Sequence, residues 1–108
     1  MKLITAPIRK ALDSTPLYTN DGKGDDAPVI VKFFGGSRYS YFVTEAEKLD
    51  DDYRLYGFVV SPLGPDCDEW GYTMLSEITQ VRFPPFGLPV ERDRSVNPGQ
   101  YTVAELRS

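Results

Sequence analysis

The stretch "PVIVKFFGGSRYSYFVTE" (residues 28–45) decides the fold class of this chain. Apolar side chains alternate onto both sides of residues 29–34, and Lys32 is the single charged residue among them. Such a two-sided apolar run predicts a strand in the interior of a sheet. The pair Gly35-Gly36 ends it, and the alternation over residues 39–44 predicts a second, half-buried strand.

Two more strands are expected further along the chain, over residues 55–60 and 70–75. Gly57 lies within the third strand, where a glycine marks a bulge or a close approach of another backbone. We expect an acidic turn over residues 45–53 between the second and third strands. Short spacings with turn residues between the strands predict an antiparallel meander.

Helical segments are expected near both ends. Thr5 as N-cap and Pro7 in the first turn predict a short helix over residues 6–12. One helical turn over residues 76–81, capped by Ser76, and another within 100–108 complete the helical content. Residues 15–27 are rich in Gly, Asp and Asn, and 82–99 contain four prolines, so both segments are predicted to be irregular.

The fold class is therefore α+β, a single domain over residues 1–108. It is a mainly antiparallel sheet of about four strands with a short N-terminal helix and a long irregular C-terminal segment. A chain of 108 residues with 41% hydrophobic and 13% aromatic residues can bury one core and has no room for two domains.

Charge and residue usage exclude several classes of function. The net charge of −4 disfavours general attachment to nucleic acid, which depends on many lysine and arginine contacts to phosphate. The chain has no histidine and a single cysteine, so histidine-based catalysis, an internal disulfide and the usual zinc sites are excluded. We predict no bound metal and no cofactor.

The opening "MKLITAPIRKALD" has no apolar run long enough for a signal peptide, and no later segment is long enough to span a membrane. We expect a cytoplasmic protein with no membrane partner.

Three segments together resemble a known family: "VKFFGGSRYSYFVTEAE", "YGFVVSPLG…WGYTMLSEI" and "VRFPPFGLPVERD". In this order and spacing they are similar to the small bacterial, plasmid and phage proteins grouped as domain of unknown function 2958. The resemblance spans nearly the whole chain, from the "MKLIT" opening to Asp93. It implies carriage on mobile genetic elements and no assigned activity. The chain departs from the pattern at Pro84-Pro85 and around Asp66 to Glu69.

The most conspicuous charged stretch is "VERD", in which Glu91 and Asp93 would share one face of an extended segment and Arg92 the other. Two carboxylates on one face can hold a cation or accept an arginine. We favour a structural clamp, in which Arg92 turns inward with Val90 and pairs with Glu77 or Glu45.

Other candidate binding residues are Lys32, Glu77 and Arg82. Lys32 is expected to extend its amine to the rim of the sheet or to pair with Glu45 on the neighbouring strand. Glu77 and Arg82 flank the turn after the fourth strand and are expected to join the same polar network. Cys67 lies between two aspartates, which do not lower a thiol pKa, so we expect no reactive thiol.

Aromatic residues are dense on the predicted sheet: Tyr39, Tyr41, Phe42, Tyr53, Tyr56, Trp70 and Tyr72. An exposed aromatic face can stack single-stranded nucleic acid, but that also needs a basic groove, and the nearby loops are acidic. We favour packing in the core and across strands.

The leading functional hypothesis is a small, non-catalytic protein that acts by protein–protein contact, inhibiting or modulating a host or phage defence system. One alternative is a nucleic-acid or nucleotide-binding accessory factor that uses the aromatic face. A further alternative is a metal-assisted hydrolase built on Glu45, Glu77, Glu91 and Asp93.

Overall fold

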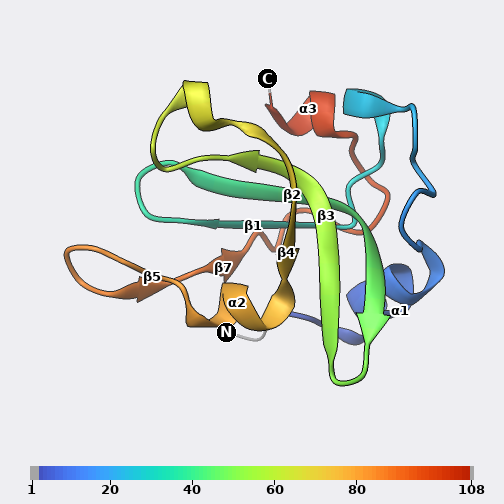
Figure 1. Cartoon of the computed structure of the whole chain (residues 1–108), viewed down its shortest axis with the longest axis horizontal. Helices are drawn as coiled ribbons and strands as arrows, with labels where there is room; N and C mark the ends of the chain where they lie inside the picture. Colours follow the sequence, from blue (N-terminus) through green and yellow to red (C-terminus); the bar gives the residue numbers. More distant parts are fainter. Residues whose placement is uncertain (1–2, 108) are drawn as a thin grey trace.

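The computed structural model describes residues 3–107, and Figure 1 shows their arrangement. The elements in chain order are α1 (Ala6–Ser14), η1 (Gly24–Asp26), β1 (Val31–Gly35), β2 (Tyr39–Leu49), β3 (Asp52–Val60), η2 (Pro65–Cys67), β4 (Glu69–Met74), α2 (Leu75–Gln80), β5 (Arg82–Phe83), β6 (Leu88–Pro89), β7 (Glu91–Arg92) and α3 (Val103–Arg107). The predicted α+β class is confirmed. Met1, Lys2 and Ser108, which belong to the predicted opening and final turn, lie outside the described residues.

A five-stranded antiparallel sheet forms the centre, in the order β4-β3-β2-β1-β7. The four predicted strands are present, and β1 is an interior strand as expected, because β2 and β7 pair with it on either side. The fifth strand, β7, comes from the "VERD" stretch. A separate two-stranded ribbon, β5-β6, projects beside it, as Figure 1 shows.

Strand β2 is longer and more deeply buried than the sequence suggests. It continues to Leu49, so most of the predicted acidic turn is strand, and the turn itself is reduced to Asp50 and Asp51. Pairing with β3 explains the extension, because Ala46 is buried there and Glu47 forms an ion pair with Arg54 at 3.0 Å. The prediction of a half-buried second strand is wrong, since residues 41–46 are buried on both faces.

Strand β1 begins at Val31, two residues later than predicted. Val29 does not pair with β2: its N–H donates to Tyr101 and its carbonyl accepts from Gly99. The C-terminal segment thereby draws Val29 to the side of the sheet opposite Val31, so the predicted shared face of these two valines is wrong.

Each face of the sheet has its own core. One contains Ile4, Ile8, Leu12, Ile30, Val31, Phe33, Tyr41, Val43, Ala46, Tyr53, Leu55, Ile78 and Val90, and the other Val29, Phe42, Phe58, Val96 and Val103. Helices α1 and α2 supply residues to the first core, and the segment from Val96 through α3 covers the second. The helix predicted over 6–12 is confirmed and runs two residues further, to Ser14.

The short helix α2 is capped differently from the prediction. Its N-cap is Met74, whose N–H donates to the Glu77 carboxylate at 3.1 Å, so the predicted Ser76 cap is wrong. Ser76 lies one position inside the helix, and its hydroxyl donates to Asp52 at 2.6 Å. This contact ties α2 to the first residue of β3.

At Gly57 the backbones of β2 and β3 approach each other closely. A Cβ built at Gly57 would lie 2.0 Å from the carbonyl oxygen of Phe42, which is backbone and cannot rotate away. On the partner strand the register shifts between Val43 and Glu45, leaving Thr44 as an extra residue. The predicted close approach at Gly57 is confirmed, and the bulge lies across from it.

We expect Gly57→Ala to lower the free energy of unfolding by about 2 kcal/mol or more, since two backbones must separate to admit the methyl group. Gly71 is the matched control, because it pairs with Gly57 across β3 and β4 and a Cβ there would meet no atom within 4 Å. Gly71→Ala should change stability by about 0.5 kcal/mol or less. Urea unfolding of both variants measures this, and equal losses would contradict the contact.

A bidentate ion pair between Arg38 and Asp68 joins the turn between β1 and β2 to the residue just before β4. The Arg38 guanidinium donates to both Asp68 carboxylate oxygens at 2.7 Å, and Asp68 also accepts the N–H of Ser61 at 2.8 Å. The hydrogen bond from Arg38, with the Ser61 N–H and the positive charge, lowers the pKa of Asp68 to about 2. The sequence did not predict this structural role of Asp68.

This pair predicts a pH dependence of stability. The pKa of Asp68 is lower in the folded chain than its ordinary value of 3.8, so its contribution is complete above that value and is lost as pH falls toward about 2. The difference in unfolding free energy between the wild type and Asp68→Asn should therefore shrink over this interval. Urea titrations at a series of pH values test it; a difference that stays constant down to pH 2 would contradict the assignment.

Candidate functional site

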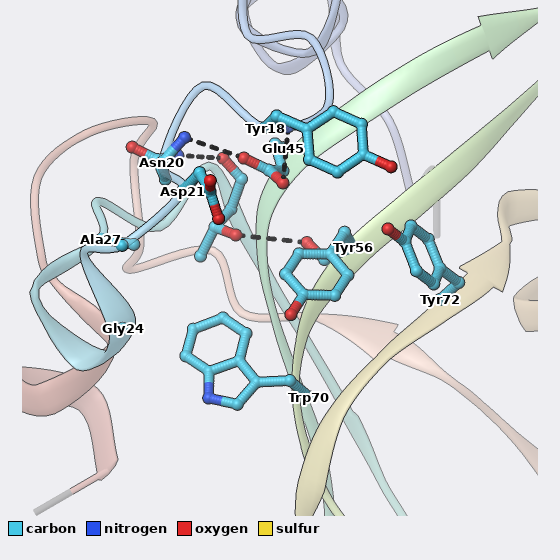
Figure 2. A pocket seen from close by; sticks show the side chains of 11 residues that line it. Tyr18, Asn20, Asp21, Gly24, Ala27, Glu45, Tyr56, Trp70 and Tyr72 are labelled. Carbon is cyan, nitrogen blue, oxygen red and sulfur yellow. Dashed lines mark hydrogen bonds between the residues drawn. The ribbon is translucent and has the colours of Figure 1, made fainter.

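A cavity with a volume of about 300 Å³ lies between the loop after α1 and the β3–β4 side of the sheet (Figure 2). We call it the aromatic pocket. Its lining consists of Tyr18, Asn20, Asp21, Gly22, Gly24, Ala27, Thr44, Glu45, Tyr56, Trp70 and Tyr72. Figure 2 shows the loop residues on one side of it and the three sheet aromatics on the other.

The sheet side is built by cross-strand pairing. Tyr56 on β3 is opposite Tyr72 on β4, and Phe58 is opposite Trp70. The Tyr56 ring stacks on Trp70 with centroids 5.6 Å apart, and on its other side lies 4.8 Å from Tyr72. Alternate residues of adjacent strands share a face, so this row of rings follows directly from the strand register.

The loop side is held by a buried carboxylate. Glu45 is 4% exposed, and its two oxygens accept the backbone N–H groups of Tyr18 and Asn20, each at 3.0 Å. The side-chain amide of Asn20 adds a hydrogen bond to the carbonyl of Thr44 at 2.9 Å. Glu45 therefore fixes the position of the loop after α1 relative to β2.

Tyr18 is held in an uncommon backbone conformation, with φ of 75°. For a bulky residue this left-handed region is strained, and such strain persists only where neighbouring contacts determine it. The hydrogen bond to Glu45 is such a contact, and the Tyr18 ring is left 70% exposed at the mouth of the pocket. The loop thus presents an aromatic side chain to solvent at a cost in backbone energy.

The pocket is electronegative. Asp21 is exposed, and among residues 3–107 neither Asp21 nor Glu45 takes part in an ion pair. Burial raises the pKa of Tyr56, and the nearby carboxylates of Glu45 and Asp21 raise it further. None of the described lining residues is a lysine or an arginine.

The candidate residues from the sequence do not meet at one place. Of these, only Glu45 lines the aromatic pocket. Lys32 pairs with Asp93 at 3.6 Å, next to the backbone hydrogen bond from Asp93 to the Lys32 carbonyl, so the expected pairing of Lys32 with Glu45 is wrong. The reason is the position of β7, which brings the C-terminal segment alongside β1.

The prediction of an Arg92 clamp also placed Val90 inward and Glu91 outward. Val90 turns inward and is 4% exposed, as predicted, and Glu91 faces outward. The pairing of Arg92 with Glu77 or Glu45 stays a prediction; the Glu45 carboxylate accepts the N–H groups of Tyr18 and Asn20, and the Glu77 carboxylate accepts the N–H of Met74. Asp93 is half-buried through its contacts with Lys32 and Ser95, and its ion pair with Lys32 joins the segment after β7 to β1.

Glu77, Arg82 and Glu91 lie on the α2 side of the molecule. Glu77 caps α2, and Arg82 donates to the carbonyls of Thr79 and Val81. Arg82 and Glu91 line a shallow depression between α2 and the N-terminal segment. The predicted polar network of Glu77, Arg82 and Lys32 is therefore divided between two regions.

The four carboxylates of the hydrolase alternative are dispersed too. Glu45 lies in the aromatic pocket, Glu77 at the start of α2, and Asp93 beside Lys32. Over residues 3–107 there is no group of three or more His, Cys, Asp or Glu side chains placed to hold a metal ion. The geometry on which that alternative was built is absent from this part of the chain.

Sequence reasoning identified the residues on the sheet side of the aromatic pocket and missed those on its loop side. The aromatic set was identified, and its expected core packing is right for Tyr41, Phe42 and Tyr53, each 2% exposed or less. Tyr56, Trp70 and Tyr72 pack against one another across β3 and β4, as was also predicted, and they form the open wall of the pocket. Tyr18, Asn20 and Asp21 were treated as irregular loop and missed, since their position depends on the distant Glu45.

The comparisons with known proteins agree with the resemblance seen in the sequence. Residues 3–104 match the family described as "Protein of unknown function (DUF2958)". The chain belongs to this family. No match was found among curated proteins or among solved structures. In the described part of the chain, every helix is too short or too polar to cross a lipid bilayer.

We expect Glu45→Gln to destabilise the fold by about 1–3 kcal/mol, because an amide NH₂ would face one of the two loop N–H groups and leave it unsatisfied. The amides of Tyr18 and Asn20 should lose hydrogen-exchange protection. Glu47→Gln is the control: Glu47 is two residues along the same strand, its ion pair with Arg54 is exposed, and its loss should cost about 0–1 kcal/mol. Equal effects of the two changes would contradict the role of Glu45.

Proposed function

We propose that the protein is a small, non-catalytic binding protein that acts by contact with another protein. The surface around the aromatic pocket is the contact region, and the partner presents a positively charged surface to it. The observation that carries the proposal is one cavity lined by exposed tyrosines and by carboxylates that form no ion pair with any lysine or arginine of residues 3–107.

The exposed rings support a protein contact. Tyr18 is 70% exposed and Tyr72 52% exposed, and both border the pocket that contains Trp70. Tyrosine and tryptophan are enriched at the centres of protein interfaces, where they supply contact area at small entropic cost. A net charge of −4, with acidic loops beside the pocket, favours association with a basic surface.

The biological setting rests on the family resemblance. It implies carriage on a plasmid, a phage or another mobile element, and we extend it to a cytoplasmic protein that inhibits or adjusts a host or phage defence system. A surface that competes for a basic groove suits such a role, although −4 is a small charge for imitating nucleic acid.

The nucleotide-binding alternative shares the aromatic wall. Tyr56 and Trp70 are stacked on each other, and a base could extend the stack. Phosphate groups would then approach Glu45 and Asp21 with no lining cation among the described residues, which opposes binding. A mobility shift that collapses with added salt would favour this alternative.

Affinity capture tests the proposed function. The wild-type chain, the double variant Tyr18→Ala/Tyr72→Ala and the control Phe86→Ala are immobilised and exposed to lysate of the native host. Phe86 is 83% exposed on the loop of the β5-β6 ribbon, away from the pocket. We expect the wild type and the Phe86 variant to retain one specific protein, identified by mass spectrometry, and the double variant to lose it.

Unchanged melting curves of all three chains are required, so that loss of capture reports the surface and not unfolding. Capture that depends on Phe86 but not on the two tyrosines would move the contact region to the β5-β6 ribbon. Absence of any protein retained specifically by the wild type would contradict the proposed function.

A further inference from the structure

We propose that the aromatic pocket is a binding site for an organic cation, an ammonium or guanidinium group seated against Tyr56, Trp70 and Tyr72 and facing Glu45 and Asp21. The inference deepens the proposed function and rests on it for the source of the cation, since a lysine or arginine of the partner is one source and a free small amine is the other.

The three aromatic rings of the sheet supply the first component of the cation site. The face of an aromatic ring carries partial negative charge, and a cation within about 6 Å of its centroid is attracted to it. Tyr56, Trp70 and Tyr72 lie in one row on two adjacent strands, with neighbouring centroids 5.6 and 4.8 Å apart. All three residues line the cavity, so a cation inside it lies beside this row of rings.

The carboxylates of Glu45 and Asp21 supply the second component of the cation site, which is negative charge. Glu45 is 4% exposed and its hydrogen-bond donors are neutral backbone N–H groups, so its negative charge is oriented but not balanced by a cation within residues 3–107. Asp21 faces the sheet from the loop side (Figure 2), and within the described chain its carboxylate accepts no hydrogen bond. A bound cation would supply the counter-charge for both carboxylates.

The same features discriminate against other ligands. A phosphate or carboxylate would meet two negative charges and no lining lysine or arginine in the described residues. A volume of about 300 Å³ is at the lower end of small-molecule sites, which span roughly 300–1,000 Å³, and suits a head group better than a whole nucleotide. A neutral apolar group would fit the rings but bring no positive charge to the two carboxylates.

The pocket is formed before any ligand arrives. Glu45 fixes the backbone at Tyr18 and Asn20, and the rings are placed by the register of β3 and β4. Gly22 and Gly24 line the pocket with φ of 82° and 53°, values that let the loop turn back toward the sheet. Little ordering is left to oppose binding, which favours affinity.

Trp70 gives a direct readout, because it is the only tryptophan of the chain and lines the pocket. The full chain is titrated at constant ionic strength with choline, with its neutral isostere 3,3-dimethyl-1-butanol, and with an acetylated Gly-Arg-Gly amide peptide. We expect choline to change the Trp70 fluorescence saturably and the isostere to bind about tenfold more weakly or not at all.

Variants locate the site. Tyr72→Leu and Asp21→Asn are expected to weaken choline binding by about threefold to tenfold each, and Phe86→Leu, on the distant ribbon, to leave it unchanged. Tyr72 and Asp21 are exposed, so these variants should fold, and their melting curves check it. Variants that fold but bind choline as the wild type does would overturn the proposal.

The probes also separate the two sources. Binding of the arginine peptide, in competition with choline, assigns the pocket to a partner's side chain, while binding of choline alone assigns it to a free small amine. Equal binding of choline and the neutral isostere, or no saturable response to either cation, overturns the cation site. These titrations need no partner protein, so they can support the cation site even if affinity capture finds no partner. Equally, affinity capture can support a protein contact even if no cation binds.

Discussion

Strand β2 is buried on both faces from Tyr41 to Ala46, and the remainder of the fold covers or extends it. Alternate side chains of one strand point to opposite sides, so this burial requires two separate covers. Helices α1 and α2 supply one, and the C-terminal segment from Val96 supplies the other. Both covers come from segments outside the four main strands: α1 precedes β1, and α2 and the segment from Val96 follow β4.

This arrangement explains why the contacts at Gly57 and Glu45 lie together. Where β2 and β3 approach closely, only glycine fits at Gly57, and the register shift beside it makes Thr44 the extra residue. Glu45 follows that shift at the edge of the α1–β1 loop, where its carboxylate accepts two loop N–H groups. The aromatic pocket thus forms at the irregularity in the sheet.

Ion pairs hold the covers in place. Arg107 donates to both carboxylate oxygens of Asp25, at 2.9 and 2.7 Å, and its guanidinium lies 3.9 Å from the centre of the Phe58 ring. Lys32 and Asp93 join β1 to the segment after β7. These contacts connect residues far apart in the chain, and neither Glu45 nor Asp21 of the pocket takes part in them.

Local patterns in the sequence determined the α+β class, the four main strands and the first helix, because alternation and turn residues act over a few positions. They also marked Gly57, Val90 and the aromatic set. The tertiary structure alone decided that Lys32 pairs with Asp93 and not with Glu45, and that Glu45 meets Tyr18 and Asn20. Such pairings join segments 25 to 61 positions apart, so they depend on strand order and on which end of the chain covers which face. Neither property is encoded in the neighbours of a single residue.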